Sequence, residues 1–200
     1  MYAFSDEDGK FAVRTARRVV EEYLKTSSVP QIVFPPKFNE KSGVFTTISR
    51  YPSHELRGCI GYPEPVYPLK EALVRSAIAA AIDDPRFPPV RYEELDGLVF
   101  EVSLLTPPEE IRVKKRKHLL KEVKIGVHGL IAERGFYRGL LLPQVPVEWG
   151  WDTREFLEQT CWKAGLPMDC WLDEHTKFYR FTAEIFEEVE PRGDIRRKKL

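Results

Sequence analysis

The order of apolar and polar positions at the start of the chain predicts a helix over residues 6–25. Apolar side chains recur there at helical spacing and fall roughly on one face. Ser5 is placed to cap the first turn, and Asp8 adds a carboxylate near the positive end of the helix dipole. The helix is expected to end at 27–30, where two serines precede a valine and a proline.

Two segments with the composition of strands come next. Residues 43–48 are rich in β-branched and aromatic side chains, and 55–61 follow a polar turn, so the two are predicted to pair as a hairpin. Successive side chains of a strand point to opposite faces. This alternation predicts that Arg57 and Cys59 share one face of the second strand, with its apolar side chains on the other.

The rest of the chain is predicted to continue with helices and strands. The expected elements are a helix at 69–82, a strand at 98–105, a short helix at 117–123, strands at 127–133 and 138–142, a helix at 153–164 and a strand at 177–187. Antiparallel sheets with helices packed on one face predict the α+β class. The recurring order of elements also suggests a duplicated β-α-β-β unit.

The charge balance argues against a general nucleic-acid binder. The 200 residues include 31 Lys and Arg and 31 Asp and Glu, whereas nucleic-acid binders usually carry a basic excess. No apolar run approaches the roughly 18 residues that span a membrane, and residues 1–10 lack the pattern of a signal peptide. Three cysteines without tight spacing indicate a reducing compartment, so a cytoplasmic location is expected.

The hexapeptide Leu-Arg-Gly-Cys-Ile-Gly at 56–61 resembles the signature of the AMMECR-one-like family. Blocks similar to those of the family follow in order at 84–87, 101–105, 125–130, 141–145 and 161–166. The resemblance covers most of the chain and implies a single α+β domain over 1–200 with two unequal subdomains. The larger subdomain is expected to comprise about 1–55 and 121–200, and the smaller about 56–120.

The hexapeptide is also the first candidate site. A thiol beside a fixed cation has the pattern of a nucleophile, because Arg57 on the same face would lower the pKa of Cys59. Gly58 and Gly61 leave room for a substrate or another backbone to approach. The alternative is a buried structural cysteine, since free cysteine is among the most buried residue types. Both interpretations stay open, and the nearest base in the sequence, His54, would face away from Cys59 in a regular strand.

Three polar residues later in the chain are further candidates. His128 stands next to a glycine at an expected bend, which suits either a general base or metal ligand for the Cys59 face or a hydrogen-bonded turn residue. Gln144 and Glu148 follow a proline that would end a strand. They are suited to bind amide or hydroxyl groups of a substrate, and they equally fit a polar loop.

Local motifs add little further chemistry. The sequence has no glycine-rich phosphate loop, no G-x-S-x-G or G-x-G-x-x-G motif, and no C-x-x-C or H-x-x-x-H spacing, so neither a cofactor nor a metal is predicted. The segment Asp84-Pro85-Arg86 is interpreted as a helix stop, with Arg86 paired locally with Asp83 or Glu93.

Two functional hypotheses follow. The first is an enzyme with a ligand or active-site cleft around the 56–61 strand, acting on a small molecule or a modified protein. The second is a non-catalytic binding or scaffold module, with regulatory function, in which the same strand lines a groove for a peptide or ligand. The family resemblance implies Memo-type and radical-SAM proteins as partners, which is an association and does not define a reaction.

Overall fold

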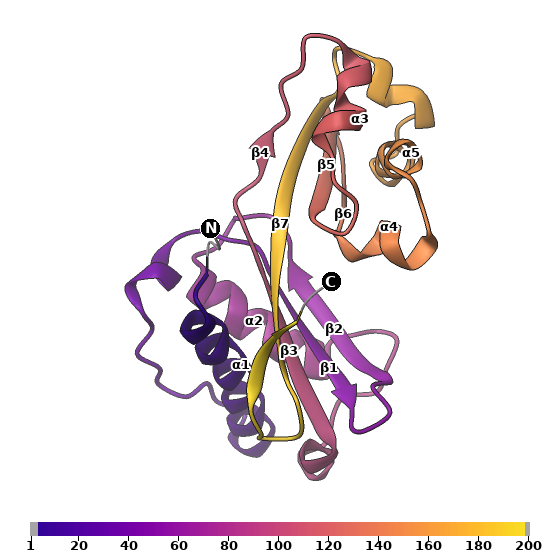
Figure 1. Ribbon diagram of the computed structural model, residues 1–200. Coiled ribbons are helices and arrows are strands. Elements are labelled where there is room, and N and C mark those ends of the chain that lie inside the picture. Colours follow the sequence, from indigo (N-terminus) through magenta and orange to yellow (C-terminus); the bar gives the residue numbers. More distant parts are fainter. Residues whose placement is uncertain (1–3, 199–200) are drawn as a thin grey trace. The chain divides into compact units, whose positions relative to one another are not determined.

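The structure of the protein is a computed structural model that describes residues 4–198 (Figure 1). Within these residues the chain forms two compact units. Unit 1 consists of 4–105 and 184–198, and unit 2 consists of 106–183. Strand β7 is shared, because its residues up to 183 belong to unit 2 and its last residues to unit 1.

Helices and antiparallel strands occur in both units, which confirms the α+β class. The α-helices are α1 Asp6–Thr26, α2 Leu69–Ile82, α3 Leu119–Glu122, α4 Gln144–Trp149 and α5 Thr153–Lys163. The strands are β1 Val44–Arg50, β2 Leu56–Tyr62, β3 Leu98–Leu105, β4 Glu109–Glu110, β5 His128–Arg134, β6 Tyr137–Leu141, β7 Lys177–Glu188 and β8 Ile195–Lys198. Short 3₁₀ helices are η1 Pro36–Asn39, η2 Tyr92–Gly97, η3 Arg116–His118 and η4 Met168–Leu172.

Unit 1 is a sheet whose apolar face is covered by two helices. The strand order is β2-β1-β3-β7, and β8 pairs with the end of β7. The predicted hairpin of β1 and β2 and the helix α1 are confirmed, including the capping box that Ser5 and Asp8 form at the helix start. Helices α1 and α2 pack against each other and against this sheet (Figure 1). The core between them contains Phe38, Phe100 and Phe186, each at most 1% exposed.

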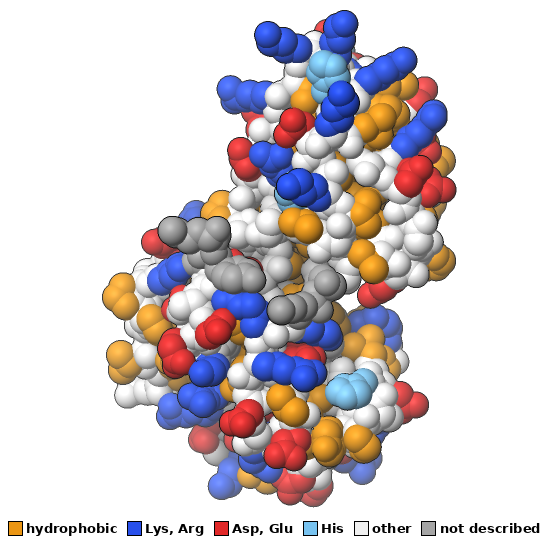
Figure 2. Space-filling model, in the orientation of Figure 1, with side chains coloured by type: hydrophobic (Ala, Val, Ile, Leu, Met, Phe, Trp, Pro, Cys, Tyr) orange, Lys and Arg blue, Asp and Glu red, His pale blue; other side chains and the backbone are white. Residues whose placement is uncertain are grey.

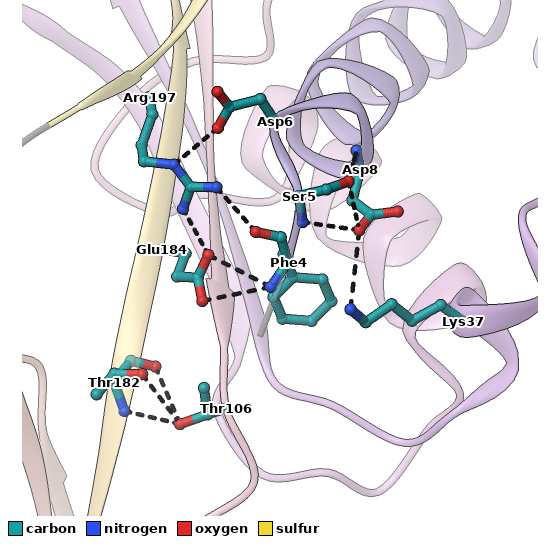
Figure 3. Close-up of polar contacts among 9 residues, drawn as sticks. All are labelled: Phe4, Ser5, Asp6, Asp8, Lys37, Thr106, Thr182, Glu184 and Arg197. Carbon is teal, nitrogen blue, oxygen red and sulfur yellow. Dashed lines mark hydrogen bonds and ion pairs between the residues drawn. The ribbon is translucent and has the colours of Figure 1, made fainter. Parts of the chain in front are cut away.

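Hydrogen bonds and buried ion pairs connect both ends of the described chain to the rest of unit 1. The Glu184 carboxylate accepts the Phe4 N–H, and Arg197 donates both to Glu184 and to the Phe4 carbonyl (Figure 3). Farther along β7, Arg17 of α1 donates to both oxygens of Glu188 at 2.6 Å. In each of these contacts the partners lie more than 160 residues apart in sequence or on different elements. The contacts therefore help to define where α1 meets the sheet.

Unit 2 has its own smaller core. Its strand order is β6-β5-β7, and β4 pairs with the other edge of β7. Helix α5 packs on β5 and β6, where Phe156, Leu157 and Phe178 are fully buried. A disulfide joins Cys161 of α5 to Cys170 of η4.

Two expectations differ from this fold. The subdomain boundaries expected at 55/56 and 120/121 would separate β2 from its partner β1. The contacts instead keep 56–105 in unit 1 and place the boundaries between the units at 105/106 and 183/184. The larger unit does draw on both ends of the chain. The three cysteines, whose spacing predicts a reducing compartment, include a disulfide between Cys161 and Cys170, and Cys59 is the free thiol.

The proposed duplication stays a prediction.

Within residues 4–198, none of the helices combines the length and the apolar character that crossing a membrane requires.

Candidate functional site

Strand β2 lies at the edge of the unit 1 sheet and contains a bulge at Arg57. The register with β1 shifts between Ile48 and Ser49, which leaves Arg57 without a partner residue in β1. A bulge of this kind bends a strand and redirects a side chain. The strict alternation predicted for this strand is therefore wrong at Arg57.

The side chain of Arg57 is buried and fully engaged. Its Nε and Nη2 donate to the two carboxylate oxygens of Glu94, both at 3.1 Å, and its other hydrogen bonds go to the carbonyls of Pro88 and Pro89. Burial raises the pKa of Glu94, but the hydrogen bonds from Arg57 and from the Arg91 N–H outweigh it and hold that pKa below its usual value. Arg57 thus fastens β2 to the segment after α2, and its guanidinium is not free for a substrate.

The glycines of the hexapeptide allow close packing. A Cβ at Gly58 would collide with the Ala80 carbonyl oxygen of α2, and one at Gly61 would collide with the ring of Phe45 in β1. Of the two expectations for these glycines, the close approach of another backbone is met at Gly58, where α2 fills the space, and at Gly61 a neighbouring side chain fills it. Neither glycine faces an open substrate pocket.

The backbone of Cys59 is held at the free edge of the sheet by the segment after α2. The Cys59 N–H donates to Asp84 Oδ2 at 2.8 Å, and Arg86 Nη2 donates to the Cys59 carbonyl at 3.3 Å. Arg86 also donates to both oxygens of Asp84, at 2.9 and 2.7 Å. The two side chains take the place that a further strand would occupy.

This arrangement corrects the expected pairing of Arg86. Its partner is the adjacent carboxylate of Asp84 rather than Asp83 or Glu93. The hydrogen bonds from Arg86 are the main reason why the pKa of Asp84 lies well below its usual range, although burial of that carboxyl opposes the shift. Asp84 is therefore an anion at every pH at which the protein would normally be studied.

The thiol of Cys59 is half-buried, and its surroundings disfavour the thiolate. Its pKa is raised, mainly by burial and further by the carboxylates of Glu101 and Asp84. The hydroxyl of Thr47 donates to Sγ at 3.3 Å, and the charge that favours the thiolate is that of Arg86. The cation predicted to activate the thiol, Arg57, is engaged elsewhere.

A small cavity lies near the same face of the sheet. Its volume is about 150 Å³, and Thr47, His54 and Glu101 are among its lining residues, whereas Cys59 is not. Lys198 Nζ at this cavity donates to Glu101 at 2.7 Å and lies 3.4 Å from Glu187. Since pockets for small molecules are usually about 300 Å³ or larger, this cavity is too small for a typical substrate.

His128 begins β5 in unit 2 and belongs to a tight turn. Its N–H donates to the Lys124 carbonyl at 2.9 Å, and its ring Nδ1 accepts the Lys124 N–H at 3.1 Å. Burial and then the charges of Arg180 and Lys124 lower the pKa of His128, so the imidazole is neutral near pH 7. Because Nδ1 is already occupied, the geometry matches the hydrogen-bonded turn residue better than a general base.

The other candidates of unit 2 lie on α4. Gln144 is the first residue of this helix, so the interpretation of a polar loop is wrong for both residues. The Gln144 Oε1 is buried without a hydrogen-bond partner among residues 4–198. Glu148 is exposed near the end of the same helix.

Unit 2 contains a larger polar cavity of about 410 Å³. It is bordered by the segment before β4, by α3 and the turn after it, and by β7. Its lining residues are Thr106, Pro107, Glu109, Lys121, Glu122, Lys124, His128, Arg180, Phe181 and Thr182. Thr106 Oγ1 accepts the Thr182 N–H at 2.8 Å, which joins two sides of the cavity wall (Figure 3).

The two units divide the candidates between them. Those of unit 1 are Arg57, Gly58, Cys59 and Gly61, and those of unit 2 are His128, Gln144 and Glu148. Neither unit by itself brings Cys59 together with His128. In the described part of the chain, 4–198, there is no group of three or more His, Cys, Asp or Glu side chains placed to hold a metal ion.

The residues that bind the hexapeptide were not identified from the sequence. Asp84 and Arg86 hold the backbone of Cys59, and Glu94 holds Arg57. The available signal was the family-like block at 84–87, which combines two charges with a proline directly after a helix. No periodicity points to Glu94, because its contact with Arg57 spans 37 residues.

Comparison with known proteins shows relatives that align over the whole chain. A protein of Thermococcus gammatolerans is 61% identical over 205 residues, covering 100% of both chains. Protein PH0010 of Pyrococcus horikoshii is 60% identical and covers 100% of this chain and 99% of its own length. The crystal structure of uncharacterized protein PH0010 matches with a TM-score of 0.86, 59% identity and complete coverage of both chains.

The family model AMMECR1 matches residues 13–186, which include both units and the hexapeptide in β2. The relatives above carry no description of an activity, so the match defines ancestry and fold rather than a reaction. On this evidence the chain belongs to the AMMECR1 family.

Proposed function

We propose that the protein is a non-catalytic binding module in which β2 is a structural strand. The observation that carries this proposal is that the distinctive groups of the hexapeptide are already engaged within unit 1. The Arg57 guanidinium is bonded to Glu94 and to two carbonyls, and the backbone of Cys59 is bonded to Asp84 and Arg86.

The environment of the thiol supports the same conclusion. A cysteine nucleophile needs a thiolate, and thiolates form where the pKa is lowered by a nearby cation, a metal or a helix start. At Cys59 burial raises the pKa instead, and the groups that act on the thiol are a hydroxyl, one arginine and two carboxylates. None of these is a histidine that could accept the proton.

The competing hypothesis, an enzyme that uses Cys59, makes a distinct prediction. It requires that the thiol attack an activated substrate at neutral pH. Partnership with Memo-type or radical-SAM proteins rests on the family resemblance alone and is compatible with either role.

A burst assay with p-nitrophenyl acetate separates the two hypotheses. A reactive thiol would be acylated and would release one p-nitrophenolate per protein chain in a rapid first phase. We expect no such burst from the wild-type protein at pH 7, and the same slow release from Cys59→Ser. A burst equal to the protein concentration that disappears in Cys59→Ser would contradict the proposal.

A further inference from the structure

The cavity of unit 2 combines positive charge with a volume suited to a small molecule. Its volume of about 410 Å³ falls within the range of about 300–1,000 Å³ that is usual for ligand pockets. Lys and Arg side chains gather on the surface around α3 (Figure 2). Three of the basic residues line the cavity itself, namely Lys121, Lys124 and Arg180.

Two of these cations have no acidic partner. In the described range 4–198, the ammonium groups of Lys121 and Lys124 form no ion pair, although both border the cavity. Ammonium groups on exposed stems are mobile and can turn toward an anion that enters the cavity. They therefore supply positive charge that no carboxylate within residues 4–198 pairs with directly.

The third cation has two exposed acidic partners and one backbone partner. Arg180 Nε lies 3.4 Å from a carboxylate oxygen of Glu109, and its Nη1 lies 3.1 Å from one of Glu122 and donates to the Glu122 carbonyl at 3.2 Å. The Glu109 and Glu122 side chains are 69% and 47% exposed, and such surface pairs usually contribute about 0–1 kcal/mol each. An oxyanion with good geometry can thus replace one carboxylate, because arginine binds carboxylate and phosphate groups in the same two-pronged manner.

His128 lies beside the same basic groups. Burial is the main cause that lowers its pKa, followed by the charges of Arg180 and Lys124, whereas a hydrogen bond with the Glu122 backbone and the charge of Glu109 act in the opposite direction. The imidazole is neutral at pH 7 and adds no charge of its own, while the same two cations attract an anion to the cavity.

From these contacts we infer that the cavity of unit 2 is a binding site for a small oxyanion, with Arg180 as its central cation and Lys121 and Lys124 at its rim. The anionic group is a phosphate or a carboxylate. Glu109 and Glu122 occupy Arg180 in the absence of ligand and compete with the anion. The inference rests on the proposed binding role and gives it a ligand class.

Calorimetric titration of the whole protein at low ionic strength tests the site. The probes are inorganic phosphate and malonate, which distinguish phosphate from carboxylate recognition. Arg180→Gln should weaken binding of the preferred probe by roughly tenfold or more, because a charged hydrogen bond is lost. Glu109→Gln should tighten it by roughly two- to fivefold, because a competing carboxylate is removed.

The matched control is Arg112→Gln. Arg112 is an exposed arginine of the same unit that pairs with Glu110 and does not line the cavity, so its loss removes the same net charge. Affinity in this variant should equal that of the wild type. If Arg180→Gln fails to fold, as judged by circular dichroism, Lys124→Gln replaces it, since an exposed lysine is dispensable for folding.

The inference is supported if either probe binds the wild type, Arg180→Gln weakens that binding and Arg112→Gln leaves it unchanged. The probe that binds then identifies the anionic group. Absence of binding of both probes to the wild type overturns it, as does equal affinity in the two arginine variants. The outcome is separable from the burst assay, because failure of anion binding leaves the structural role of β2 intact.

Discussion

Arg57 connects β2 to the segment that follows α2. Its five-donor guanidinium reaches one carboxylate and two carbonyls that a shorter or more flexible cation would not join. The pair with Glu94 is half-buried rather than fully enclosed, because the arginine side chain is 4% exposed and the glutamate 27%.

Arg57→Ala should lower the free energy of unfolding by about 2–3 kcal/mol, somewhat less than the 3–5 kcal/mol typical of a fully buried pair. Arg50→Ala is the control, because Arg50 lies 3.9 Å from the same carboxylate and is 49% exposed. Its loss should cost at most about 1 kcal/mol. Urea denaturation of the two variants measures the difference, and equal stabilities would refute the structural role of Arg57.

Asp84 gives the stability of unit 1 a dependence on pH. Its folded pKa is lowered, so its contribution is fully present above the unfolded value of about 3.9 and is lost as the pH falls toward the folded value. Asp84→Asn keeps the shape of the side chain and removes the charge.

We expect Asp84→Asn to cost roughly 1–3 kcal/mol at pH 6, and the difference from the wild type to narrow as the pH falls below about 4. Chemical denaturation at several pH values measures it. The neighbouring exposed Asp83→Asn should change little at any pH. A cost that is independent of pH would show that the ion pair with Arg86 is not its source.

The contact between β2 and α2 depends on the absence of a side chain at Gly58. The Ala80 carbonyl of α2 occupies the position of a Cβ, and backbone cannot move aside as a flexible side chain can. Strand and helix would therefore have to separate to admit even a methyl group.

Gly58→Ala should destabilise the protein by about 1–3 kcal/mol through overpacking. Gly97 is the matched control, since a Cβ there meets no atom within 4 Å and its backbone is not in the left-handed region. Gly97→Ala should leave the melting temperature unchanged or slightly raised. If thermal melts of the two variants coincide, the close approach is not what requires glycine at position 58.

Local features of unit 1 were predictable from the sequence, whereas contacts between distant residues were not. Helix α1 and its capping box were predictable because their signals lie within a few residues of one another. The bulge at Arg57 was not, because a shift of register depends on the partner strand. The role of Asp84 was missed because a hydrogen bond across 25 residues leaves no periodic trace.

Long-range pairing also explains why the division into units was misplaced. Strand β7 pairs with β5 over its first residues and with β8 over its last, so one strand contributes to both cores. A sequence pattern identifies the strand but not its partners. The disulfide likewise could not be inferred, because a spacing of nine residues between cysteines fits many folds.

The two cores are expected to respond separately to loss of this disulfide. Replacing Cys161 and Cys170 together with alanine opens a short loop, which should cost about 2–3 kcal/mol. The loss should appear as faster hydrogen exchange in β5, β6 and α5, while β1 and β3 keep their protection. Equal acceleration in all of these elements would show that the units do not unfold separately.

The central claim, that Cys59 is structural, is tested most directly by the pH dependence of its alkylation in the folded protein. With Cys161 and Cys170 in a disulfide, Cys59 supplies the labelling signal. We predict an apparent pKa above the value of about 8.5 for a free cysteine, raised further by Arg86→Gln. An apparent Cys59 pKa of about 7 or lower in the wild type, together with a higher value in Arg57→Ala, would contradict the account. Arg57 would then be activating a nucleophile.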